Sequence, residues 1–108
     1  MSITINIYYT GKNGAARAFA CEMTESGIVD EIRREDGNER YEYFYPAEDN
    51  ETVLLIDRWR DKEALYHHHN SPIMAKIAKM REKYDLHMTA NRYVSADAPS
   101  GDDKFLRK

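Results

Sequence analysis

Cysteine is almost absent from this chain, and other absences narrow its class further. Cys21 is the single cysteine among 108 residues, so no disulfide can form within the chain, and a reducing cytoplasm is the expected compartment. No apolar run approaches the roughly 20 residues that a membrane span needs. The opening residues 1–9 are too short and too polar for a signal peptide. We therefore expect no membrane partner, and we expect Cys21 to be a small buried side chain.

Positive charge is not in excess either. The chain has 16 Lys and Arg against 19 Asp and Glu, a net charge of −3, and a pI of about 5.8. Nucleic-acid binding needs clustered Lys and Arg, so nucleic acid is not an expected partner. Hydrophobic residues make up 42% and charged residues 32%, which is typical of an ordered chain, and this length leaves room for one domain.

The common enzyme signatures are missing as well. The sequence contains no P-loop, no Rossmann glycine pattern, no Cys-x-x-Cys pair and no serine–histidine–acid order. Three histidines are adjacent at residues 67–69, but successive helix residues project about 100° apart. They cannot converge on one metal, for which a spacing of i and i+4 is needed. Neither a metal nor an organic cofactor is expected.

The hydrophobic pattern predicts an α+β domain. Alternation predicts strands over residues 3–9, 39–45, 51–60 and 86–94. Apolar spacing of three to four predicts helices over residues 15–26, 28–35, 61–69 and 71–84. Asn13, Asp61 and Ser71 are the expected helix caps. Residues 1–95 would form the domain, and residues 96–108 a loose polar tail.

The strand predicted over residues 51–60 is apolar on both of its sides. The side chains alternate between two sets, which are Val53, Leu55, Asp57 and Trp59, and Leu54, Ile56 and Arg58. Both sets begin apolar, which is typical of a strand buried on both faces. The helices suffice for one face of a four-stranded sheet. The other face must bury against something, and a second copy of the chain is the simplest candidate, which predicts a homodimer.

Four motifs together carry a resemblance to a known family. They are the opening strand followed by Gly11-Lys12 and a helix, then Gly37-Asn38-x-x-Tyr41, Leu55-Ile56-Asp57-x-Trp59, and Ala64-Leu65-x-x-His68-x-x-Ser71-Pro72. Over residues 3–94 they resemble the antibiotic biosynthesis monooxygenase family, small oxygenases related to quinol monooxygenases. The resemblance implies a ferredoxin-like α+β fold, a dimeric α+β barrel and a substrate pocket between sheet and helices. It also implies oxygenation of phenols or quinols without metal or flavin.

Two departures from the family pattern bear on the chemistry. Heme-degrading relatives look to place a tryptophan at the position of His68 and an iron-ligating histidine at the position of Ala78. Of the three functional positions of those relatives, only the asparagine is matched here, by Asn6, so heme degradation is not expected. Many members have a further histidine at the position of Ile73, and its absence here weakens any mechanism that needs two histidines.

Five residues are candidates for the site. His68 matches the family histidine and would take a phenolic proton, since an imidazole can act as a base at neutral pH; the alternative is a packed helix histidine. Asn6 would hydrogen-bond a substrate carbonyl or an oxygen derived from dioxygen, or else a neighbouring strand. Trp59, Asp57 and Tyr43 would bind substrate. Trp59 has the alternative of a core anchor, and Asp57 of an ion pair across the dimer.

The expected function is a cofactor-independent monooxygenase that uses dioxygen on a small phenol or quinol. His68 would remove the phenolic proton to give an electron-rich phenolate, and Asn6 would stabilise developing charge. Two alternatives stay open. One is an isomerase or another acid–base enzyme acting on a small oxygenated metabolite, and the other is a dimer that binds a small aromatic ligand without turnover.

Overall fold

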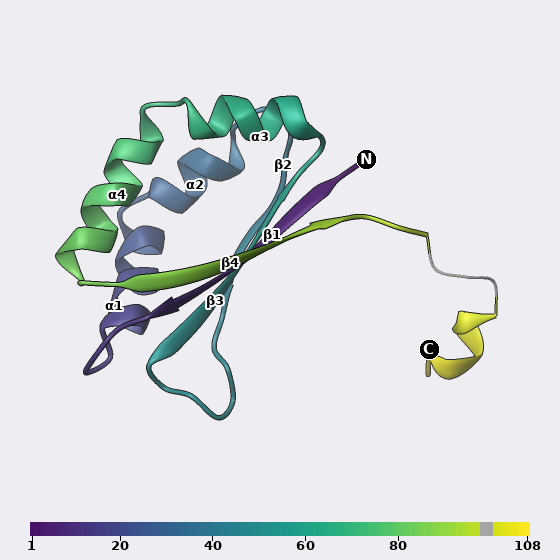
Figure 1. Cartoon of the computed structure of the whole chain (residues 1–108), viewed down its shortest axis with the longest axis horizontal. Coiled ribbons are helices and arrows are strands. Elements are labelled where there is room, and N and C mark those ends of the chain that lie inside the picture. Colours follow the sequence, from purple (N-terminus) through teal and green to yellow (C-terminus); the bar gives the residue numbers. More distant parts are fainter. Residues whose placement is uncertain (98–100) are drawn as a thin grey trace.

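Two layers, a sheet and a set of helices, make up the body of the molecule (Figure 1). We describe residues 1–97 and 101–108 of a computed structural model. The strands are β1 (Ile3–Thr10), β2 (Asn38–Phe44), β3 (Thr52–Trp59) and β4 (His87–Val94). The helices are α1 (Ala15–Glu25), α2 (Ile28–Arg33), α3 (Lys62–His69) and α4 (Ile73–Lys83), and a short 3-10 helix η1 covers Asp102–Phe105. None of the described helices is long and apolar enough to cross a bilayer.

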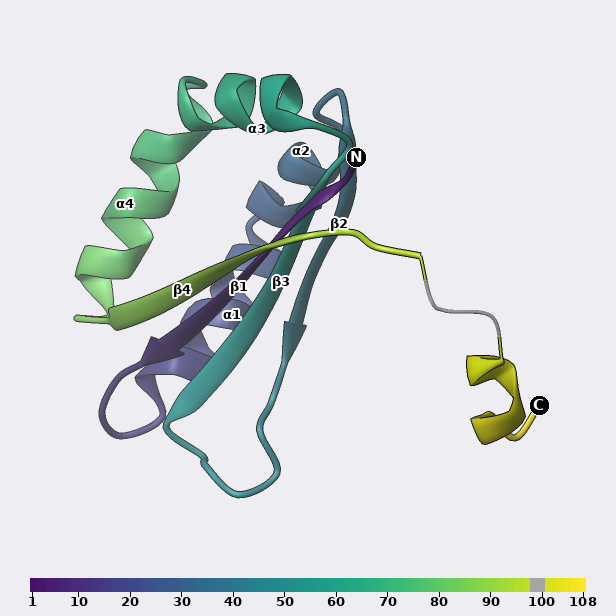
Figure 2. The ribbon, with the colours of Figure 1, turned by 45° about the vertical axis from the view of Figure 1, so that its right-hand side comes forward.

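The sheet is antiparallel throughout, with the strand order β2-β3-β1-β4. The helices lie on one side of it, as the two views of Figures 1 and 2 agree. The register sets Ile3 opposite Trp59 on β3 and opposite Val94 on β4. This is the ferredoxin-like α+β arrangement, so the predicted fold of the single chain is confirmed.

Alternation along β3 decides which side chains enter the core. Val53, Leu55 and Trp59 are fully buried beneath the helices, whereas Leu54, Ile56 and Arg58 on the opposite face are only partly buried. On α1 the buried residues recur at helical spacing, namely Ala16, Phe19, Ala20 and Met23. Cys21 falls outside that stripe and is exposed, so the expectation that it is buried is wrong.

The helix caps follow the sequence only in part. Asp61 caps α3 as predicted, because its side chain accepts a hydrogen bond of 2.9 Å from the Ala64 amide. Ser71 does not cap α4, because its hydroxyl donates to the His68 carbonyl at 2.7 Å and Pro72 takes the cap position. Asn13 does not cap α1 either. Its left-handed φ of 56° makes it a turn residue, and Gly14 becomes the cap.

Besides the sheet face that points away from the helices, two parts of the molecule are left uncovered. All the side chains of β4 are exposed, since the helices do not extend over this edge strand. Residues 101–108 are also exposed, and they lie away from both layers (Figure 2). The helix-covered face over β1, β2 and β3 is therefore where buried functional groups can gather.

Candidate active site

His68 is buried in the last turn of α3, and two neighbours fix its imidazole. Its side chain lies between the helix and the sheet, and the residue is 3% exposed. Nδ1 is 2.8 Å from Oε2 of Glu35, a residue of the segment after α2. A carboxylate can only accept, so Nδ1 carries the hydrogen and donates it, which leaves the lone pair on Nε2 free to take a proton.

Trp59 supports the same imidazole from the sheet. The two rings are stacked with their centroids 4.6 Å apart and their planes at 26°. The contact uses one face of the indole, and the rest of the ring is packed in the hydrophobic core. Trp59 is fully buried at the end of β3, so the position of His68 is set by the core rather than by solvent.

Asp57 lies two residues before Trp59 on the same face of β3, and it is 4% exposed. The pKa of Asp57 is raised to about 7, chiefly by burial and to a lesser extent by the Glu35 carboxylate, while the Trp59 indole and the Arg81 charge oppose the rise. Although the two groups are neighbours, neither Oδ1 of Asp57 nor Nε1 of Trp59 has a hydrogen-bond partner of good geometry in the described residues. A carboxyl group that titrates near neutral pH can accept or donate a proton.

Tyrosines continue this polar strip toward β2. Tyr41 lies opposite Asp57 in the register, and its ring meets that of Tyr43 edge-on at 6.0 Å. Burial raises the pKa of both phenols above the ordinary value. The Tyr43 hydroxyl is buried near that of Tyr41 but has no hydrogen-bond partner of good geometry in the described residues. The Tyr9 hydroxyl, by contrast, accepts hydrogen bonds from Arg81 at 2.9 and 3.2 Å. Unpartnered buried polar atoms are places where a water or a ligand is expected.

Asn6 lies on the other face of the sheet. It is paired with Ile56 and Asn91, so its side chain points away from Asp57 and from the helices. Its amide oxygen is buried without a partner in the described part of the chain. The structure thus brings together His68, Trp59, Asp57 and Tyr43 on one face, and it does not bring Asn6 to them.

A surface groove gives access to His68. Its volume is about 310 Å³, and Glu35, Asp36, Arg60 and Ser71 are among its lining residues together with His68. Gly37 allows the turn before β2 to pack closely against α3, because a Cβ added there would collide with Ala64. Its φ of 85° is also a conformation that favours glycine. Within residues 1–97 and 101–108, no three His, Cys, Asp or Glu side chains converge as metal ligands would.

Sequence reasoning missed Glu35 and Tyr41 as members of this cluster. Glu35 is 33 residues from His68 in the chain, and no spacing rule connects a residue after one helix with the end of another. Tyr41 belongs to a tyrosine stripe that the sequence does show. Its place beside Asp57 depends on the register of β2 against β3, which the stripe alone does not fix.

The fold and the buried acid–base cluster define a small ferredoxin-like α+β protein with a candidate active site between sheet and helices. The family model for antibiotic biosynthesis monooxygenases matches residues 2–80, so the chain belongs to that family. No curated protein matches it in sequence.

Solved structures share the fold at low identity. A candidate antibiotic biosynthesis monooxygenase from Deinococcus radiodurans is 16% identical, with a TM-score of 0.76 over 93% of this chain and 97% of that one. A second candidate, from Nitrosomonas europaea, is 20% identical, with a TM-score of 0.72 over 88% and 98%. SnoaB from Streptomyces nogalater, described as a cofactor-independent oxygenase, is 13% identical, with a TM-score of 0.74 over 92% and 97%. At these identities the likeness establishes the fold alone.

Proposed function

We propose that this protein is a cofactor-independent monooxygenase of a small phenol or quinol. The observation that carries the proposal is the buried acid–base cluster, in which His68 is held by Glu35 next to a carboxyl group that titrates near neutral pH. Such perturbed groups gather where proton transfer is catalysed. The family membership and the fold shared with SnoaB support the same reaction class.

In the proposed reaction, Nε2 of His68 takes the phenolic proton. The Glu35 carboxylate stabilises the imidazolium that results, as a buried carboxylate does for a catalytic histidine. The phenolate then supplies electrons to dioxygen. A phenol and dioxygen give a quinone and water, so one oxygen atom enters the ring, the other leaves as water, and no outside reductant is needed.

The other residues of the covered face have supporting roles in this proposal. Asp57, whose pKa burial raises to about 7, orients a substrate hydroxyl and exchanges a proton with it. Trp59 fixes the imidazole plane and offers its N–H, which lacks a partner of good geometry in the described residues, to the substrate. The unpartnered Tyr43 hydroxyl hydrogen-bonds a substrate oxygen. Asn6 faces away from this site, and we assign it to the surface between two subunits.

The active form in this proposal is a homodimer of the domain formed by residues 1–95, with residues 96–108 as a tail. The uncovered sheet face carries Tyr8, Phe44, Leu54 and Ile56, an apolar set that a second copy would bury. An obligate interface of this kind buries on the order of 2,000 Å² or more. Sedimentation at micromolar concentration should give a dimer, and a folded monomer would contradict this part of the proposal.

Oxygen uptake tests the function directly. Chelator-treated protein is assayed with a panel of quinols and polyphenols. For at least one of them we expect uptake matched by a quinone that carries one added oxygen atom, with water rather than hydrogen peroxide as the second product. Turnover of a substrate without oxygen uptake would favour an isomerase or another acid–base enzyme. Saturable binding without any turnover would favour a ligand-binding dimer.

A further inference from the structure

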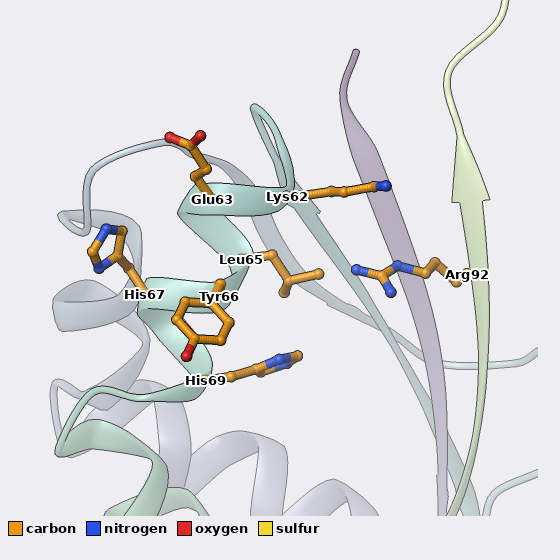
Figure 3. A pocket seen from close by; sticks show the side chains of 7 residues that line it. All are labelled: Lys62, Glu63, Leu65, Tyr66, His67, His69 and Arg92. Carbon is orange, nitrogen blue, oxygen red and sulfur yellow. The ribbon is translucent and has the colours of Figure 1, made fainter.

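A second and larger groove lies between α3 and β4 (Figure 3). Its volume is about 610 Å³. It exists because the helices leave β4 uncovered, so that the side chains of this strand that point toward the helix layer remain exposed. Tyr66, which is 68% exposed, contributes an aromatic ring to the groove, and the buried Leu65 lies beneath the groove with 1% of its surface exposed.

Three cationic or titratable side chains reach into the space between the helix and the strand. Figure 3 shows Lys62 and His69 extending from α3 toward β4, and Arg92 extending from β4 toward Leu65. Arg92 is paired with Ile5, which places it on the helix side of the sheet. The one acidic lining residue, Glu63, points away from this space (Figure 3).

These positive charges lack acidic partners. Within the described residues neither Lys62 nor Arg92 makes an ion pair, although Arg58, Arg60 and Lys83 do so elsewhere. Burial lowers the pKa of His69, and the charges of His68, Arg92 and Arg81 lower it further. Two fixed cations and an imidazole beside the exposed Tyr66 ring form a surface complementary to an anion that carries a flat apolar body.

We propose that this groove binds the carboxylate of a small aromatic acid, with the ring of the acid against Tyr66. The His69 ring is 5.8 Å from that of His68, so the groove adjoins the candidate active site. That the bound acid is the substrate rests on the proposed oxygenase function. The substrate class would then be carboxylated phenols, and Arg92 and Lys62 would determine specificity for them.

Calorimetric titration at low ionic strength tests the binding, with 4-hydroxybenzoate and its uncharged methyl ester as probes. The acid should bind about tenfold more tightly than the ester, because each charge-assisted contact adds roughly that much. Arg92→Gln should weaken binding of the acid about tenfold and leave the ester unchanged. Added salt should weaken the acid alone, since these cations are exposed.

Two further variants keep the result interpretable. Lys79→Gln, on the exposed face of α4, is the matched control and should change neither affinity. Arg92→Lys keeps the charge and should retain most of the binding, which separates loss of charge from loss of folding. Equal affinities for acid and ester, or an equal loss in Lys79→Gln, would overturn the groove as an anion site.

The same titrations distinguish a failure of this inference from a failure of the oxygenase proposal. Tight binding of the acid without oxygen uptake on any substrate would contradict the proposed oxygenase function and support the groove as a carboxylate-binding site. Oxygen uptake with uncharged quinols, together with no preference for the acid over the ester, would contradict carboxylate binding in the groove and support the proposed oxygenase function.

Discussion

The two faces of the sheet have opposite characters, although the same strands form both. On the helix-covered face, Asp57, Trp59 and Tyr41 are buried, and burial raises the pKa of both Asp57 and Tyr41. On the uncovered face of a single subunit, charged side chains lie in solvent, as in the Arg58–Glu39 ion pair of 3.1 Å, whose side chains are 43% and 38% exposed. Burial rather than residue type therefore separates a surface that can do acid–base chemistry from one suited to a partner.

Neighbouring residues on β3 offer the strongest contrast in stability. Trp59→Ala should cost about 3–5 kcal/mol, because it removes the largest fully buried side chain and leaves a cavity beside His68. Arg58→Ala, one residue earlier on the other face, should cost less than about 1 kcal/mol, since its ion pair is exposed. Urea unfolding at one fixed protein concentration measures both. Similar losses would show that the faces do not differ in this way.

The pH dependence of stability should depend on Asp57. Its pKa rises from 3.8 to about 7 on folding, so the unfolded chain releases this proton at a lower pH than the folded protein. The free energy of unfolding should therefore fall as pH rises from about 4 to about 7, by up to roughly 4 kcal/mol from this group.

Asp57→Asn should remove that fall, and it should make the protein more stable than wild type at pH 8. Asp103→Asn, in the exposed tail, is the control and should keep the wild-type pH dependence. A wild-type profile without a fall across this range would mean that Asp57 is already ionised at low pH.

Glu35 and Glu31 are a matched pair of carboxylates for mutation. Glu35 contacts the buried His68, whereas Glu31 contacts the exposed Lys76. Glu35→Gln should slow oxygen uptake about tenfold or more, because it removes the charge that favours the Nδ1–H tautomer and the imidazolium. Glu31→Gln breaks only the exposed pair with Lys76 and should leave the rate unchanged. Nitrogen NMR of His68 should detect a changed tautomer in the first variant alone, and an unchanged spectrum would exclude this positioning role.

Two tyrosines of the covered face give the smallest expected effect. Tyr9→Phe should cost about 1 kcal/mol, since Arg81 loses its acceptor. Tyr43→Phe should be neutral or slightly stabilising, because its buried hydroxyl has no partner in the described residues. If that hydroxyl binds substrate, the same variant should raise KM. A stability loss in Tyr43→Phe equal to that in Tyr9→Phe would argue for a structural hydrogen bond instead.

The fold could be predicted from the sequence because its signals are local. Alternation along residues 53–59 identified both faces of β3, and the spacing of Ala16, Phe19 and Met23 identified α1. Caps were less predictable, since Ser71 and Asn13 are typical cap residues that here make other bonds or turns.

The site could be predicted only in part, because it depends on contacts between distant segments. Alternation gives each strand two faces, but only the register shows that Ile5 lies opposite Asp57 and hence that Asn6 points the other way. The Glu35–His68 pair and the approach of Arg92 to Lys62 depend in the same way on how helices pack against strands.

The separation of the two faces is tested most directly by oxygen uptake of His68→Ala beside Asn6→Ala, on a substrate that the panel yields, with the oligomeric state of each variant checked by sedimentation. We expect His68→Ala to lose about 10²–10⁴-fold in rate while still folded. Asn6→Ala should retain a rate near that of wild type wherever its assembly is intact. Full activity in folded His68→Ala, or loss of activity in Asn6→Ala with an intact assembly, would contradict the assignment of the chemistry to the helix-covered face.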